Sequence, residues 1–170
     1  MHLLEQSSRL PVAAARVWSR AVTEEGINDE LRPLLRMTMP RSLRGKTIDE
    51  VEVGVPLGRS WILLGGLIPV DYDDLSLVEL EPGRRFLERS RMLAFAVWQH
   101  ERIVEPEAGD ACRVTDRLGF ELRSAVVWIP GMAWLAEAIV GALFRHRHRR
   151  LARHHSGEQR RAQADEPQSS

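Results

Sequence analysis

The sequence has a single cysteine, Cys112, among 170 residues. One cysteine forms neither an internal disulfide nor a cysteine-based zinc site, which disfavours a disulfide-stapled secreted fold and indicates a reducing compartment. The N-terminal segment contains the charged residues Glu5 and Arg9 and no apolar run of signal-peptide length. We therefore expect a cytoplasmic protein.

Several catalytic signatures are also missing from the sequence. It contains no phosphate loop of the form G-x-x-x-x-G-K-[ST], no G-x-G-x-x-G fingerprint, no G-x-S-x-G elbow and no H-E-x-x-H motif. The histidines near the C-terminal end include no pair at the i, i+4 spacing of a helical metal site: His146, His148, His154 and His155. We expect no metal and no cofactor, and we disfavour nucleotide-dependent enzymes, hydrolases and zinc proteases.

The composition is typical of one soluble globular domain, with 44% apolar residues, 28% charged residues and no net charge. The charge is unevenly placed, because residues 145–161 carry seven arginines and four histidines against one acid, Glu158. This end is interpreted as a solvated helix terminus or, alternatively, as a peripheral contact to an anionic membrane. The arginines of the membrane interpretation are Arg145, Arg147, Arg149, Arg150 and Arg153. Nucleic-acid binding is not expected, because no aromatic residues interleave with them and the rest of the chain is mildly acidic.

The N-terminal part predicts a strand followed by two short helices. Residues 1–10 are typical of a strand, and residues 12–22 have apolar side chains at helical spacing. Thr23 predicts the N-cap of a second helix, which we expect to continue to Pro40 with a kink at Pro33.

The middle of the chain is typical of successive antiparallel strands joined by short turns. A continuous apolar strand is predicted over residues 58–70, with a bend at Gly65 and Gly66. Further strands are predicted over residues 75–80, 85–95, 96–105 and 112–123. The acidic run of Asp71, Asp73 and Asp74 lacks the glycine and glutamate of a calcium loop, so we interpret it as a solvated turn.

A long amphipathic helix is predicted over residues 132–155, and the polar remainder, 156–170, is expected to be a disordered tail. Residues 125–144 also have the length and the basic flank of a membrane span. The break at Pro130 and Gly131 and the charge of Glu137 argue against a span.

Several segments resemble the bacterial branch of the START-like superfamily, also called SRPBCC. They are Pro11 with Val17 and Trp18, WQHERIVEP at 98–106, RVTDRLGFELR at 113–123 and LFRHRHRRL at 143–151. That superfamily includes lipid-transfer domains and bacterial polyketide cyclases and aromatases. The resemblance implies an α+β helix-grip fold, in which a curved antiparallel β-sheet wraps around a long C-terminal helix and two short helices follow the first strand. It covers residues 1–155, which we expect to form one START-like ligand-binding domain.

A curved sheet that grips one helix tends to leave an apolar cavity between them, and such a cavity is typical of a small-molecule site. Candidates for its wall come from the predicted strands and the last helix: Trp61, Leu63, Phe86, Met92, Trp98, Leu118, Phe120, Met132, Leu135, Ile139 and Leu143. The alternative for each of them is an ordinary core position.

Polar residues within two apolar strand faces are a more specific signal. Pairing Val104 with Val114 places Arg102 opposite Asp116, with His100 on the same face. His100, Arg102 and Asp116 are therefore the candidate catalytic residues, and His100 is also a candidate ligand contact. The alternative is a structural ion pair beside a hydrogen-bonded histidine.

We expect the protein to bind a small hydrophobic molecule, such as a lipid, an isoprenoid or a polyketide, in a cavity under the C-terminal helix. One alternative is a cyclase or aromatase-like enzyme in which His100, Arg102 and Asp116 place the substrate and transfer protons. Another is a peripheral membrane or partner-binding protein that works through the arginine-rich helix end.

Overall fold

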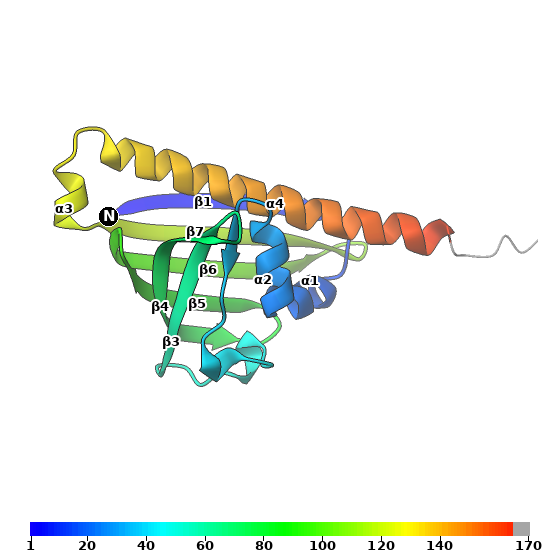
Figure 1. Ribbon diagram of the computed structural model, residues 1–170. Helices are drawn as coiled ribbons and strands as arrows, with labels where there is room; N and C mark the ends of the chain where they lie inside the picture. Colours follow the sequence, from blue (N-terminus) through cyan, green and yellow to red (C-terminus); the bar gives the residue numbers. More distant parts are fainter. Residues whose placement is uncertain (165–170) are drawn as a thin grey trace, which may run out of the picture.

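A curved antiparallel sheet and one long helix across its concave face dominate the computed structural model, which describes residues 1–164 (Figure 1). The seven strands lie in the order β1-β7-β6-β5-β4-β3-β2. They are β1 (His2–Leu10), β2 (Leu35–Met37), β3 (Pro56–Leu64), β4 (Ile68–Glu81), β5 (Arg85–Met92), β6 (Phe95–Glu107) and β7 (Ala111–Leu122). The α-helices are α1 (Ala14–Ala21), α2 (Glu24–Leu31), α3 (Ser124–Val127) and α4 (Met132–Ala164), with short 3-10 turns at Arg41–Leu43 and Ile48–Glu50.

The predicted α+β helix-grip architecture is confirmed. The short helices α1 and α2 follow β1 and close one side of the concave face, while α4 crosses the other side next to β1 (Figure 1). The first strand, β1, pairs with the last strand, β7, and so lies at one edge of the sheet. Helix α4 contacts β1 at this edge.

The predicted register of β6 and β7 is also confirmed. Val104 lies opposite Val114, Arg102 lies opposite Asp116, and His100 shares their face of the sheet. Because side chains alternate between the two faces of a strand, this register turns these polar groups toward the interior of the fold.

The prediction that the second helix continues to Pro40 is wrong. Helix α2 ends at Leu31, and residues 35–37 form the edge strand β2. Arg32 is extended ahead of Pro33, a conformation that proline imposes on the residue before it. The Asn28 side chain then holds β2 in place, since its Nδ2 donates to the Met37 carbonyl (2.9 Å) and its Oδ1 accepts from the Met37 amide (2.7 Å).

The continuous strand predicted over residues 58–70 is two strands. Gly65 and Gly66 both have positive φ and form the tight turn between β3 and β4, so the chain reverses there instead of bending. The interpretation of Asp71, Asp73 and Asp74 as a solvated turn is likewise wrong, because all three lie within β4.

The last helix extends beyond the predicted boundary at residue 155. Helix α4 continues to Ala164, because residues 159–164 are glutamine, arginine and alanine, all favourable in helices. Residues 165–170 of the expected tail lie outside the described residues. The chain breaks before α4 at Pro130 and Gly131, as predicted, and no helix within residues 1–164 is long and apolar enough to span a membrane.

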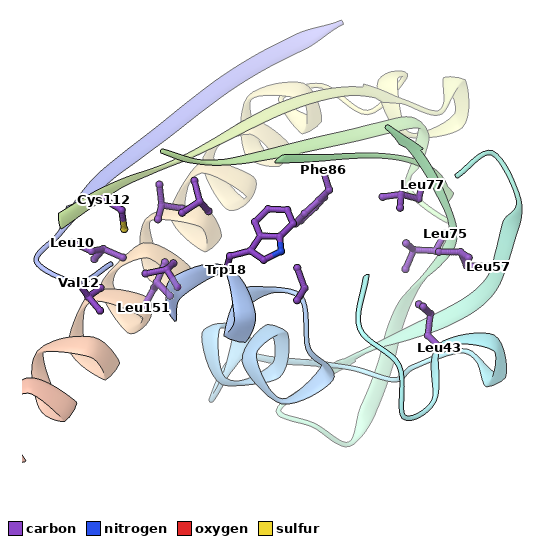
Figure 2. Close-up of a cluster of buried hydrophobic side chains, with 14 residues drawn as sticks. Leu10, Val12, Trp18, Leu43, Leu57, Leu75, Leu77, Phe86, Cys112 and Leu151 are labelled. Carbon is purple, nitrogen blue, oxygen red and sulfur yellow. The ribbon is translucent and has the colours of Figure 1, made fainter. Parts of the chain in front are cut away.

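The buried apolar side chains form two clusters. In the larger one, Trp18 and Phe86 lie between residues near the C-terminal part of α4 and residues of β3 and β4 (Figure 2). Its members that Figure 2 labels are Leu10, Val12, Trp18, Leu43, Leu57, Leu75, Leu77, Phe86, Cys112 and Leu151. The smaller cluster packs Ala136, Val140 and Phe144 of α4 against Trp98 and neighbouring residues of β6 and β7. These clusters fix the helix on the sheet at two places.

Candidate functional site

A cavity of about 520 Å³ lies between the concave face of the sheet, α2 and the first half of α4. Most of its wall is apolar. Four of its apolar wall residues are also exposed, namely Leu64 and Val70 at the β3–β4 hairpin and Leu135 and Ile139 on α4. The cavity therefore opens to solvent between that hairpin and α4.

Most of the predicted wall residues line this cavity. They are Phe86, Met92, Trp98, His100, Met132, Leu135, Ile139 and Leu143. On α4, Leu135, Ile139 and Leu143 recur at every fourth position, so they share one helical face.

Four predicted wall residues do not line the cavity. Trp61 is half-exposed and packs edge-on against Tyr72. Leu63 lies on the same face of β3 as Trp61. The residues of β3 that line the cavity are Ile62 and Leu64, on the opposite face. The prediction chose the wrong face because β3 is apolar on both sides. Leu118 and Phe120 do face inward, but the smaller cluster buries them beneath α4.

Four acidic residues that the sequence interpretation did not place in the cavity also line it: Glu24, Asp71, Asp73 and Glu88. Asp73 of β4 is 4% exposed, and Glu88 of β5 is half-buried. The pKa of Asp73 is raised to about 7, mainly because the carboxyl is buried and secondly because the carboxylate of Glu88 is close to it. The alternation of β4 carried the signal: Asp73, Leu75 and Leu77 occupy every second position and are all buried.

Of the three candidate catalytic residues, His100 alone borders the cavity. Arg102 and Asp116 lie deeper, and each is at most 1% exposed. Arg102 donates from Nε and Nη2 to both oxygens of Asp116, each at 2.7 Å, and from Nη1 and Nη2 to both oxygens of Glu30, at 2.7 and 2.9 Å. One guanidinium thus joins β6, β7 and α2 through two bidentate pairs.

His100 connects this buried ion pair to the cavity. Its Nε2 lies 3.0 Å from Asp116 and its Nδ1 lies 3.3 Å from Glu88, and the rings of Phe86 and Phe144 pack edge-on against it. Burial lowers the pKa of His100, but Asp116 and Glu88 outweigh burial and raise it. A protonated His100 satisfies both carboxylates, because each ring nitrogen then donates one hydrogen bond.

The opposite shift affects the buried carboxyls. Burial raises the pKa of Asp116, but Arg102 and His100 lower it well below its usual range. Burial likewise opposes ionisation of Glu30, and Arg102 and Arg147 nonetheless lower its pKa. With His100 protonated, three cations (Arg102, Arg147 and His100) balance three anions (Glu30, Asp116 and Glu88).

The arginine-rich end of α4 is partly used within the fold. Arg147 is buried and donates to Glu30 at 3.1 Å, and Arg150 donates to Asp29 at 2.8 Å. His148 contacts Asp116 through Nε2 and Ser8 through Nδ1. Arg147 is therefore removed from the predicted membrane-contact set, because its charge is neutralised inside the protein. Arg145, Arg149 and Arg153 are exposed.

Within the described part of the chain, no group of three or more histidine, cysteine, aspartate or glutamate side chains is arranged to hold a metal ion. What the cavity offers is a mostly apolar wall with a few polar groups: Asp71, Asp73, Glu88 and His100 on the sheet, Arg147 on α4, and Glu24 and Lys46 elsewhere in the wall. Such a lining is suited to orienting a small apolar molecule through one polar group.

Comparisons with known proteins agree with this geometry. A family model described as "Domain of unknown function (DUF8410)" matches residues 8–155. No match was found among curated proteins.

Solved structures show the same fold at low sequence identity. A START superfamily protein from Mycobacterium smegmatis is 11% identical with a TM-score of 0.65, covering 92% of this chain and 99% of its own. The Zhui aromatase/cyclase from Streptomyces sp. R1128 is 14% identical with a TM-score of 0.64, covering 91% and 93%. Protein CV1439 from Chromobacterium violaceum is 14% identical with a TM-score of 0.62, covering 89% and 96%. The START-like fold is thereby established for this chain.

The Arg102→Met variant tests the buried ion network. Removing the guanidinium leaves the carboxylates of Glu30 and Asp116 buried with fewer partners, so we expect the free energy of unfolding to fall by ~3–5 kcal/mol. Urea denaturation measures it. The matched control is Arg89→Met, an exposed arginine on the adjacent strand β5, where a change within about 0.5 kcal/mol is expected. A loss below about 1 kcal/mol in Arg102→Met would contradict the network's structural role.

The Asp73→Asn variant tests the raised pKa. The unfolded carboxyl ionises near 3.8 and the folded one at about 7, so the native state binds the proton more tightly and wild-type stability falls as pH rises between these values. Asparagine removes this penalty, so we expect roughly 2–4 kcal/mol more stability than wild type at pH 8 and little difference at pH 4. Urea denaturation at both pH values measures it. Asp74→Asn, which instead removes an exposed pair with Arg59, should give no such gain. Equal effects of Asp73→Asn at the two pH values would disprove the assignment.

Proposed function

This chain belongs to the DUF8410 family, and we propose that it binds a small hydrophobic molecule in the cavity between its sheet and α4. The observation that carries the proposal is the cavity of about 520 Å³. That volume falls in the range of ~300–1,000 Å³ that is typical of small-molecule sites. Lipids, isoprenoids and polyketide-like molecules are the ligand classes that the apolar wall supports.

The way α4 divides its apolar surface supports this proposal. Ala136, Val140 and Phe144 pack on the sheet in the smaller cluster and border the cavity from there. Leu135 and Ile139, on the adjoining face, line the cavity without belonging to that cluster. A helix that served packing alone would bury both rows. Here Leu135 and Ile139 are 41% and 58% exposed, which keeps apolar surface available to an entering ligand.

A series of straight-chain alcohols from hexanol to decanol tests the proposal. Each added methylene that enters the cavity contributes about 0.8 kcal/mol, so we expect affinity to rise about fourfold per carbon. Displacement of the apolar dye N-phenyl-1-naphthylamine measures the affinity. Affinity that is independent of chain length, or no displacement at all, would refute binding in this cavity.

Two variants on neighbouring positions of α4 locate the bound alcohol. Leu143→Asp places a carboxylate in the cavity wall, and we expect decanol affinity to fall at least tenfold, because a hydrated charge replaces apolar surface that the alkyl chain would contact. Ala142→Asp introduces the same residue one position away on the exposed face, with the same cost in helix propensity. We expect it to bind decanol like wild type. Equal losses in both variants would show that the site is elsewhere.

A cyclase or aromatase-like enzyme is the second candidate. The neighbour from Streptomyces sp. R1128 is named an aromatase/cyclase, and two groups suited to proton transfer, His100 and Asp73, line the cavity. The pKa of Asp73, raised to about 7, is matched to acid–base work near neutral pH. The test is incubation with a synthetic poly-β-ketone thioester, followed by the absorbance of a newly formed aromatic ring. Acceleration that Asp73→Asn abolishes supports an enzyme, and no acceleration leaves the binding protein.

A further inference from the structure

A carboxyl group with one unpartnered oxygen lies in the cavity wall. Asp73 is 4% exposed, and its Oδ1 has no hydrogen-bond partner among the described residues. Directly across the sheet on β3 is Ser60, which is fully buried and whose Oγ is also without a partner. The Oγ of Ser90 is likewise without a partner in this part of the chain, and of these three residues only Asp73 lines the cavity. Buried polar atoms are nearly always hydrogen-bonded in proteins, so the free oxygen of Asp73 indicates that a molecule in the cavity supplies its partner.

The charges near Asp73 are of one sign. Glu88, Asp71 and Asp74 all disfavour its ionisation. Within residues 1–164, no salt bridge connects Asp73 to a cation. Asp74 is neutralised by Arg59 on the outer face, and Glu88 reaches His100. The electrostatic potential at Asp73 therefore favours a positive charge.

None of the described cations that border the cavity forms a salt bridge with Asp73. Arg147 pairs with Glu30, and His100 lies between Asp116 and Glu88. Lys46 belongs to the exposed segment between the two 3-10 turns. Asp73 therefore faces a mostly apolar cavity without a paired cation from the described residues, and a positively charged ligand would supply one.

Aromatic rings complete this end of the cavity. Phe95 and Trp98 both line it, with ring centroids 5.3 Å apart. Trp98 pairs with Ser90, whose side chain lies near enough to Asp73 to lower its pKa. Aromatic faces attract ammonium groups, so the surroundings of Asp73 combine the two groups that recognise an organic cation.

We propose that the ligand of this cavity is an apolar amine, whose ammonium group binds Asp73 while its hydrocarbon body lies against the wall of α4 and the sheet. This inference rests on the proposed function and names its ligand class. An alcohol supplies a hydrogen bond to Asp73 but no charge, and a carboxylic acid adds a further negative charge beside Asp73 and Glu88. The expected order of affinity is therefore amine, alcohol, acid.

Decylamine, decanol and decanoic acid test the inference, each below its micelle concentration at pH 7.5, with displacement of N-phenyl-1-naphthylamine as the readout. We expect decylamine to bind wild type at least tenfold more tightly than decanol, and decanoic acid to bind more weakly than decanol. In Asp73→Asn, decylamine should lose at least tenfold while decanol affinity stays within twofold. Asp74→Asn, on the opposite face of the same strand, should keep the wild-type order.

The outcomes separate this inference from the proposed function. Decanol binding without an amine preference overturns the amine class and leaves the cavity function standing. A preference for decanol that Asp73→Asn abolishes also overturns it, because the group recognised is then a neutral donor. Failure of all three probes to bind refutes the proposed function, and the inference falls with it. An amine preference that Asp73→Asn and Asp74→Asn reduce equally places the cation elsewhere and overturns the assignment to Asp73.

Discussion

The guanidinium of Arg102, held between the carboxylates of Glu30 and Asp116, is the interaction on which the arrangement of the interior depends. It donates four hydrogen bonds, all shorter than 3.0 Å, to groups from α2 and β7. Glu30 in turn binds Arg147, so the same network attaches α4. Buried charges are tolerated only when they are paired and hydrogen-bonded, which forces these elements into one relative position.

The cavity exists because this network occupies only one end of the concave face. Near Arg147 the space between α4 and the sheet is filled by paired charges and, beyond them, by the larger apolar cluster. Toward the start of α4, the row of Ala136, Val140 and Phe144 packs on the sheet, and Glu137 contacts His2 of β1. Leu135 and Ile139, on the adjoining face of α4, stay exposed, and the cavity lies between them and the curved sheet.

The sequence predicted those features that local alternation determines. Pairing Val104 with Val114 on matching strand faces predicted the register of β6 and β7, and apolar periodicity predicted the long C-terminal helix. The partner Glu30 could not be predicted, because it lies 72 positions from Arg102 and meets it only in the folded state. Trp61 was assigned to the wrong face, since a strand that is apolar on both sides gives alternation nothing to distinguish.

Asp73 and Arg102 are both buried ionisable residues, but the surroundings of Arg102 stabilise its charge and those of Asp73 do not. Every donor of Arg102 that forms a hydrogen bond meets a carboxylate, and the resulting pKa shifts favour the charged forms. Asp73 is shifted the other way, because burial and like charges surround it. A stable fold gains nothing from such a residue, and positions that violate local rules without compensation are where function is expected. Glu88 belongs to both regions, since it contacts His100 on one side and lines the cavity on the other. Glu88 is thus one of the residues that the cavity wall and the buried ion network have in common.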